Sequence, residues 1–137
     1  MITIENIYKT RNLNGKKIAI VRSYRKPIDN MPQWDALSPS YALLKTYLDL
    51  RKKGNWNQKS FDEIYVPQFL KEMKLYHQND LNMLYTQAKK QDLVLCCYCQ
   101  HEELCHRSII AGLMQGAGIK VAGKDYSKYF TMYKNLK

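Results

Sequence analysis

The chain lacks the features of a membrane, secreted or multidomain protein. None of its apolar runs approaches the ~20 residues that a membrane-spanning helix needs. The opening segment, MITIENIYKTRN, lacks the basic-then-apolar pattern of a secretory signal. No repeat, low-complexity tract or Gly/Ser linker divides the 137 residues. We therefore expect one cytoplasmic domain with no membrane partner, and the sequence leaves its oligomeric state open.

Cysteine is absent from most of the chain and confined to one short segment, at Cys96, Cys97, Cys99 and Cys105. Cross-links among residues this close in sequence would constrain little of the chain, so a disulfide framework is excluded. We expect reduced thiols or metal ligands instead.

Acidic residues are also scarce. The chain has 22 Lys and Arg residues against 12 Asp and Glu residues, for a net charge of +10. Such an excess favours polyanionic partners, such as nucleic acid, a nucleotide or an acidic protein. The alternative is a solvated, lysine-rich surface with no specific partner.

Apolar periodicity predicts an α/β fold. We expect strands at 2–8, 17–22, 93–99 and 119–122. We expect helices that begin at Ser38-Pro39, that span 61–69 with an interruption at Pro67, that begin at Asn79-Asp80, and that span 109–117. The run at 93–99 is continuously apolar, which is typical of a strand buried on both faces.

The order strand, loop, helix, strand over 92–122 predicts a parallel crossover unit. The expected class is a small, mostly parallel sheet flanked by helices, a three-layer, Rossmann-like arrangement. Residues 1–123 would form this domain, and 124–137 a basic, aromatic C-terminal extension. The aromatic residues of the extension have helical spacing, which favours a helix docked on the domain over a surface that stacks on bases.

The segment from Cys97 to Ser108 carries the chemistry, because it lies at the carboxyl end of a predicted central strand, where α/β proteins bind ligands. Arg107 and Ser108 would open a helix, whose N-terminus attracts phosphate or another anion. The same field would favour a reactive thiolate at Cys105 or Cys99, with His106 as its base.

Two other interpretations of this segment remain. Cys97, Cys99, Cys105 and His106 supply three sulfurs and an imidazole, a ligand set that zinc accepts. The cysteines could instead serve as small apolar side chains in a buried strand. This second interpretation does not suit Cys105-His106-Arg107, because a polar triplet at a helix start does not fill a core.

The chain resembles the domain-of-unknown-function 488 (DUF488) family at two motifs. Cys97-Tyr98, a short acidic loop and Cys105-His106-Arg107 match its strand end and Cys-His-Arg helix start. Upstream, Leu37-Ser38-Pro39-Ser40 resembles its Leu-Ala-Pro-Ser/Thr helix start, and Arg22 matches an arginine at the end of a strand. The resemblance covers roughly 17–121, and it departs from the family where Cys99 replaces a usual glutamate.

The resemblance implies an α/β fold in which Arg22, Cys97 and Cys105-His106-Arg107 converge on one pocket. It implies no particular reaction. We therefore expect an electropositive pocket for a phosphate-bearing or other anionic ligand, such as a nucleotide, and leave open whether the protein is an enzyme. The alternative is a non-enzymatic accessory module, of the kind found in phages and mobile elements, which binds nucleic acid or protein through its basic surface.

Overall fold

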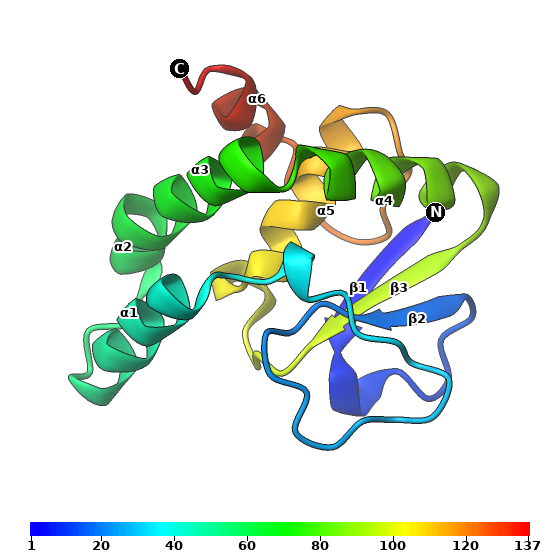
Figure 1. The fold of residues 1–137 in the computed structure, drawn as a ribbon, viewed down its shortest axis with the longest axis horizontal. Helices are drawn as coiled ribbons and strands as arrows, with labels where there is room; N and C mark the ends of the chain where they lie inside the picture. Colours follow the sequence, from blue (N-terminus) through cyan, green and yellow to red (C-terminus); the bar gives the residue numbers. More distant parts are fainter.

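A three-stranded parallel sheet, in the order β1-β3-β2, forms the centre of the computed structural model, which describes residues 1–137 (Figure 1). The strands are β1 (Ile2–Asn6), β2 (Lys16–Ala19) and β3 (Leu93–Cys97). Leu95 of β3 is paired with Ile4 on one side and with Ile18 on the other. Every residue of β3 is buried, as its unbroken apolar run predicts.

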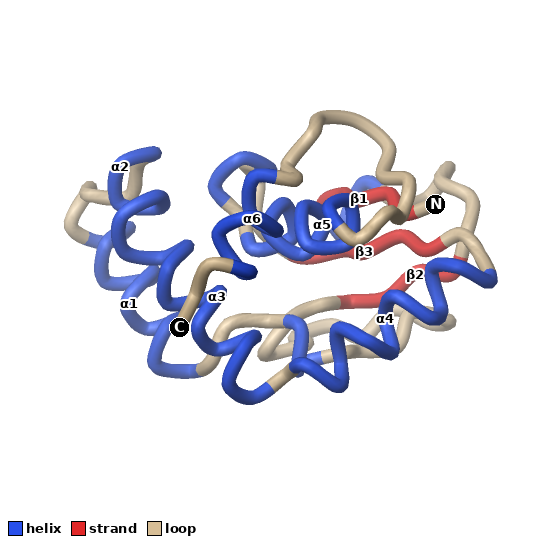
Figure 2. The backbone as a smooth tube through the Cα atoms, turned by 90° about the horizontal axis from the view of Figure 1, so that it is seen from above, coloured by secondary structure: helices blue, strands red, loops and turns tan.

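The helices are α1 (Tyr41–Lys52), α2 (Gln58–Ser60), α3 (Val66–Tyr76), α4 (Gln78–Lys90), α5 (His106–Gly116) and α6 (Lys128–Lys134). Shorter turns are η1 (Ile7–Lys9), η2 (Asp35–Leu37), the π-helical η3 (Phe61–Tyr65) and η4 (Glu102–Leu104). Helices α4 and α5 lie on one side of the sheet and η1 lies on the other (Figures 1 and 2). The predicted α/β class, with a small parallel sheet and flanking helices, is confirmed.

The first helix begins two residues later than the sequence predicts. Ser38 does not cap it; its hydroxyl donates to the Asp35 carbonyl, 2.6 Å away, and closes η2. Ser40 is the cap, because its Oγ accepts from the Leu43 amide at 3.1 Å. The buried Glu72 of α3 fixes this start by accepting hydrogen bonds from both the amide and the hydroxyl of Ser40.

The predicted interruption at Pro67 is present as a change of helix type: the π-helical η3 ends at Tyr65, and α3 begins at Val66 with Pro67 in its first turn, where no amide donor is needed. Two other predicted boundaries are wrong. Helix α4 begins at Gln78, so Asp80 lies inside it, where its carboxylate accepts from Trp34 Nε1 at 3.0 Å. The strand expected at 119–122 is reduced to a single parallel bridge between Ile2 and Val121. The chain then turns at Gly123, which has a φ of 92°.

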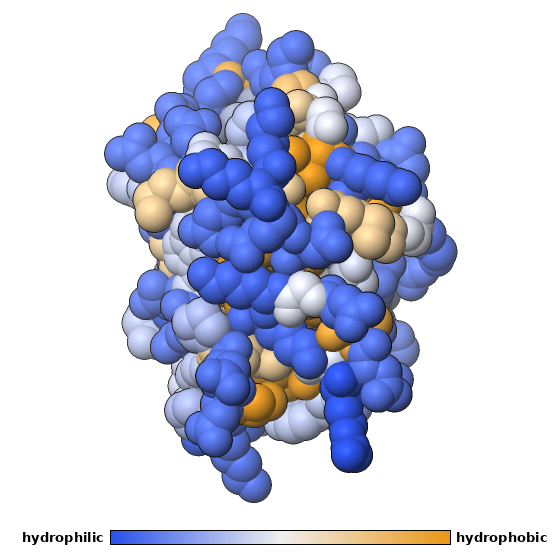
Figure 3. Space-filling model, turned by 90° about the vertical axis from the view of Figure 1, so that its right-hand side faces the viewer, coloured by the Kyte–Doolittle hydropathy of each residue, from blue (hydrophilic) through white to orange (hydrophobic).

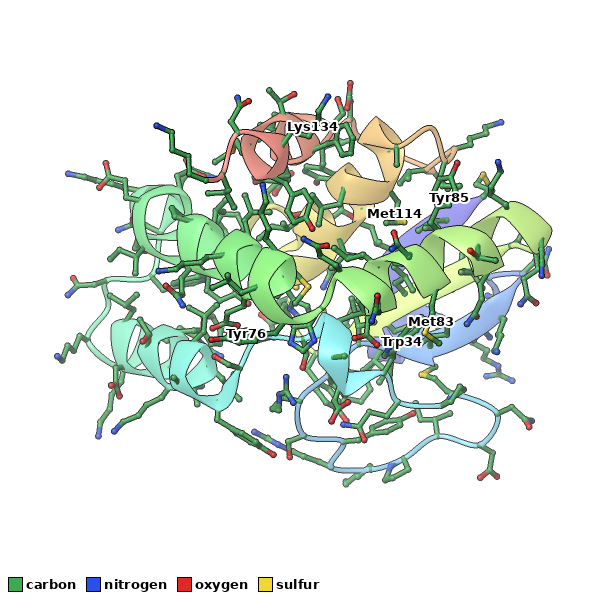
Figure 4. The ribbon with its side chains drawn as sticks, turned by 45° about the horizontal axis from the view of Figure 1, so that its top comes forward. Trp34, Tyr76, Met83, Tyr85, Met114 and Lys134 are labelled. Atoms are coloured by element: carbon green, nitrogen blue, oxygen red, sulfur yellow. The ribbon has the colours of Figure 1, made fainter.

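The C-terminal extension packs against α5. Tyr126 and Tyr129 are buried and Phe130 is partly buried. The contact depends on glycine: a Cβ at Gly112 would lie 2.0 Å from the carbonyl oxygen of Tyr126, and one at Gly116 would lie 2.2 Å from the Phe130 side chain. A small hollow of about 170 Å³ remains between α4, α5 and α6, near Tyr85 and Met114, which are labelled in Figure 4.

The face drawn in Figure 3 is mostly hydrophilic, with small and separate apolar patches. None of the helices combines the length and the apolar character needed to cross a membrane.

Candidate functional site

A cavity of about 610 Å³ opens at the carboxyl end of the sheet, between the end of β3 and α1. Among the side chains that line it are Arg22, Arg25 and Arg51, and none of the twenty lining residues is an aspartate or glutamate. Three cysteines also line the cavity and form what we call its inner wall: Cys97, Cys99 and Cys105. The cavity therefore brings cationic groups and thiols together at the edge where parallel sheets bind ligands.

Leu43, Leu44, Tyr47 and Leu48 form an apolar stripe on α1 that faces this cavity more than the core. Of its four members, only Leu43 is fully buried. Leu44, Tyr47 and Leu48 line the cavity, and Leu48 is 48% exposed. Helical periodicity correctly identifies a shared face but does not distinguish a cavity wall from a packed interface.

Aromatic residues form the wall of the cavity beside α1. The ring of Trp56 lies edge-on to that of Tyr47, with centroids 4.7 Å apart, and edge-on to that of Tyr65 at 5.5 Å. Phe61 and Tyr65 of the π-helical η3 and Phe69 of α3 form a stacked column. The column ends near the imidazole of His106, whose ring centroid lies 5.9 Å from that of Phe69.

The loop between β3 and α5 is held by two side chains from elsewhere in the fold. Asn6, the last residue of β1, donates from Nδ2 to the carbonyl of Cys99 at 3.0 Å. Arg107 donates from Nη1 to the same carbonyl at 2.8 Å. The backbone around Cys99 is therefore fixed from both sides.

Four potential ligand atoms converge at the inner wall: the sulfurs of Cys97, Cys99 and Cys105 and a ring nitrogen of His106 all lie within 4.8 Å of one another. The sulfurs of Cys97 and Cys105 are 3.0 Å apart. Nη1 of Arg107 donates to the sulfur of Cys97 at 3.2 Å. We refer to these five residues as the Cys-His-Arg cluster.

The orientation of His106 is fixed by a backbone carbonyl of Ile20, the residue that directly follows β2. Its Nε2 lies 2.6 Å from the carbonyl oxygen of Ile20, a distance that requires Nε2 to carry the proton and donate it. In the neutral ring, Nδ1 is then an acceptor that faces the sulfur of Cys105 at 3.7 Å. The imidazole therefore directs a lone pair into the cluster.

The thiols of the cluster differ in acidity. Burial would raise the pKa of Cys97, but hydrogen bonds from Cys105 and Cys99, together with the charge of Arg107 and that of His106 when its ring is protonated, lower it well below its ordinary value. Burial and the bond to Cys97 raise the pKa of Cys105 well above its ordinary value. For Cys99, a bond with Cys105 lowers the pKa, but the bond to Cys97 and burial outweigh it and raise the pKa to about 12. Of the three thiols, Cys97 therefore has the surroundings that most favour ionisation, whereas the nucleophile expected from the sequence, Cys105 or Cys99, stays a prediction.

Two residues predicted to contact an anion do not line the cavity. Arg107 is only 2% exposed, and its guanidinium is directed at sulfur and backbone, with Nε left without a partner. Ser108 is fully buried, and its hydroxyl donates to the Cys105 carbonyl at 2.8 Å. Arg22 does line the cavity, where Nε donates to the Pro39 carbonyl and Nη1 lies 3.6 Å from Asp35.

Sequence reasoning missed most of the cationic and aromatic wall. Arg51 lies in the last turn of α1, where a cation is ordinary, and its guanidinium donates to the Tyr47 hydroxyl at 3.0 Å and borders the cavity. The spacing of Tyr47 and Arg51, four residues apart on one helix, was the available signal. Nothing local indicated that Arg25 and Trp56 would reach the same cavity.

The donor set also suits a metal ion. Three cysteine sulfurs and one imidazole form a combination that structural zinc sites use. A histidine ligand ordinarily donates its second ring N–H to a carbonyl, as His106 does to Ile20. Cys97, Cys99, Cys105 and His106 could therefore hold a metal.

Fold and site together define a small α/β protein with a buried cysteine-histidine-arginine cluster beneath an arginine-lined cavity. A family model described as "Active DUF488-N3 subclade" matches residues 2–118. The chain therefore belongs to the DUF488 family. No curated protein and no solved structure gives a significant match.

Proposed function

We propose that the cavity binds a phosphate-bearing or other anionic small molecule. The observation that carries this proposal is the composition of the wall: three arginines and no carboxylate line one large cavity, and the Asp35 carboxylate lies near only Arg22. A guanidinium presents a planar fork of donors that matches phosphate or carboxylate oxygens. A recess lined by positive charges alone raises the local concentration of anions from solution.

The aromatic wall supports a nucleotide-like ligand over a bare phosphate. Tyr47 and Trp56 lie on the same wall as Arg51, so a planar base could contact the rings while its phosphate meets a guanidinium. The volume of about 610 Å³ lies in the range of small-molecule sites.

If the protein is an enzyme, Cys97 is the candidate nucleophile. Its sulfur lies at the inner wall of the cavity and is supported by the Arg107 guanidinium. Cys105 and Cys99 would assist as hydrogen-bond donors, and His106 would hold or accept a proton through Nδ1.

Titration calorimetry with inorganic phosphate, pyrophosphate and a nucleoside diphosphate tests the binding proposal. We expect the nucleoside diphosphate to bind most tightly, and Arg22→Gln and Arg51→Gln each to weaken it about tenfold. The matched control is Lys128→Ala, which removes an exposed cation on α6, far from the cavity lining. Equal affinities for the wild type, both arginine variants and the control would contradict the proposal.

A structural zinc ion is a second candidate, favoured by the Nδ1 lone pair that His106 directs at the sulfurs. Zinc would hold the loop between β3 and α5 in place and convert the three thiols to ligands. Elemental analysis of protein expressed in zinc-supplemented medium tests it. One equivalent of zinc, lost in a His106→Ala variant but kept in Cys96→Ala, would support the site, and no zinc in any preparation would exclude it.

A further inference from the structure

The sulfurs of Cys97 and Cys105 are neighbours in the buried cluster and are not joined. They lie 3.0 Å apart, and a covalent disulfide needs an S–S distance of about 2.05 Å, so the two atoms need to approach by roughly 1 Å. Cys105 has extended backbone angles at the N-cap of α5, outside the helix, so its side chain can adjust without breaking the helix. The fold therefore allows this pair to close.

Access and charge distinguish this pair from the remaining buried thiol of β3. Cys97 and Cys105 both line the cavity but are each only 1% exposed, so an oxidant that reaches them has to be small and has to come through the cavity. Nη1 of Arg107 lies 3.2 Å from the sulfur of Cys97 and 3.7 Å from that of Cys105. Cys96 points to the opposite face of β3, and its thiol donates a hydrogen bond to the Val94 carbonyl.

We propose that Cys97 and Cys105 form a redox dithiol that reduces hydroperoxides entering the cavity. The Cys97 sulfur attacks the terminal peroxide oxygen, the O–O bond breaks, and the alcohol or water leaves with a proton. Cys97 is then a sulfenic acid, oxidised by two electrons. The Cys105 thiol attacks that sulfur, forms the Cys97–Cys105 disulfide and releases water.

A dithiol reductant completes the cycle. One of its thiolates attacks the disulfide to form a mixed disulfide, and its second thiol displaces the protein thiol, which restores Cys97 and Cys105. Cys99 is the thiol of the cluster that is partly exposed, and it lines the same cavity. It is therefore the cluster thiol most open to exchange with an external dithiol, although the cycle needs only Cys97 and Cys105.

The test uses the full chain, reduced and treated with a chelator, and exposed to one equivalent of hydrogen peroxide. Peptide mapping should find a disulfide between Cys97 and Cys105 in the wild type and in the Cys96→Ala control. The Cys105→Ser variant should instead accumulate a sulfenic acid at Cys97, detected with a dimedone probe. The Cys97→Ser variant should lose both products. With excess dithiothreitol, the wild type and Cys96→Ala should consume peroxide catalytically, and Cys97→Ser should not.

Circular dichroism of each variant separates loss of chemistry from loss of folding. Mapping of the disulfide in the wild type tests the proposal even where a variant fails to fold. A disulfide between another pair, equal oxidation of all four cysteines, or an unoxidised Cys97 in the folded wild type would overturn the proposal. Retention of zinc through chelation, with protection of all three cluster thiols, would also overturn it. Phosphate or nucleotide binding is measured separately, so failure of one proposal leaves the other intact.

Discussion

The two ends of α5 are built on different principles. At its N-terminal end, His106, Arg107 and Ser108 are buried polar residues, each held by specific hydrogen bonds. Further along, Gly112 and Gly116 lack a Cβ, which allows the backbone at Tyr126 and the α6 side chain of Phe130 to approach closely. The first end depends on the chemical identity of each group, whereas the second depends on shape. Substitutions at the first should therefore alter chemistry, and substitutions at the second should alter stability.

The largest loss of stability is expected from Gly112→Ala. The added Cβ would meet the backbone carbonyl of Tyr126 at 2.0 Å, and a backbone atom cannot move aside as a flexible side chain can. We expect the free energy of unfolding to fall by about 3 kcal/mol, measured by urea denaturation. The control Asn82→Ala, an exposed change on α4, should leave it almost unchanged. A Gly112→Ala variant as stable as the wild type would show that the segment at Tyr126, which leads into α6, does not lie against α5.

Arg107→Met should combine a smaller loss of stability with a change in thiol chemistry. It removes the charged hydrogen bonds to the Cys99 carbonyl and the Cys97 sulfur, at a cost of about 2 kcal/mol. The Arg107 charge also helps to lower the pKa of Cys97, so that pKa should rise in the variant. The rate of iodoacetamide labelling at Cys97 as a function of pH measures the change, with the exposed Arg11→Met as control. An unaltered labelling profile would mean that the guanidinium does not act on this thiol.

Alkaline pH should lower the free energy of unfolding by weakening the packing of α6 and the residues before it against α5. We expect this effect to be smaller than those of the two substitutions. Burial is the main cause that raises the pKa of Tyr129 to about 12 and also raises that of Tyr126, whereas an unfolded tyrosine ionises near pH 10. Because the folded state holds these protons more tightly, its stability is complete below pH 10 and declines between pH 10 and about 12. Tyr129→Phe should flatten that decline in denaturation curves collected across this range. An equally steep decline in the variant would assign the pH dependence to other groups.

The smallest effect is expected from Lys128→Ala, which tests whether the basic surface has a function of its own. Its side chain is exposed, so unfolding free energy should change by less than about 0.5 kcal/mol. Binding of an oligonucleotide should also be unaffected. If Lys128→Ala weakens that binding and lowers its salt slope by about one unit, the chain binds nucleic acid through α6 as well.

Sequence patterns predicted the parts of the fold that depend on local burial. The apolar run of β3 and the Cys-His-Arg helix start were located correctly, because each is set by neighbours in sequence. The start of α1 was not, because it depends on Glu72, which is 32 residues from Ser40. The bridge at Val121 also required knowledge of β1, its partner across the fold.

In the candidate site as well, sequence patterns predicted what nearby residues determine and missed what contacts across the fold determine. The sequence brought Cys97, Cys99, Cys105 and His106 together, and the structure places their ligand atoms within 4.8 Å. It did not point to Cys97 as a candidate thiolate, because the hydrogen bonds that favour ionisation of its sulfur come from the folded arrangement of the cluster. Nor did it reveal that Arg107 would contact sulfur, since a helix-start arginine fits an anion equally well before its direction is known.

The position of Trp56 makes it an intrinsic fluorescence probe of ligand binding in the cavity. Its indole lines the cavity beside Tyr47, whereas the only other tryptophan, Trp34, is hydrogen-bonded to Asp80 and is not part of the cavity wall. A ligand that displaces water from the cavity changes the surroundings of one indole and leaves the other as a constant background. Intrinsic fluorescence of the unlabelled chain should therefore report occupancy directly, and a Trp34→Phe variant should isolate that signal.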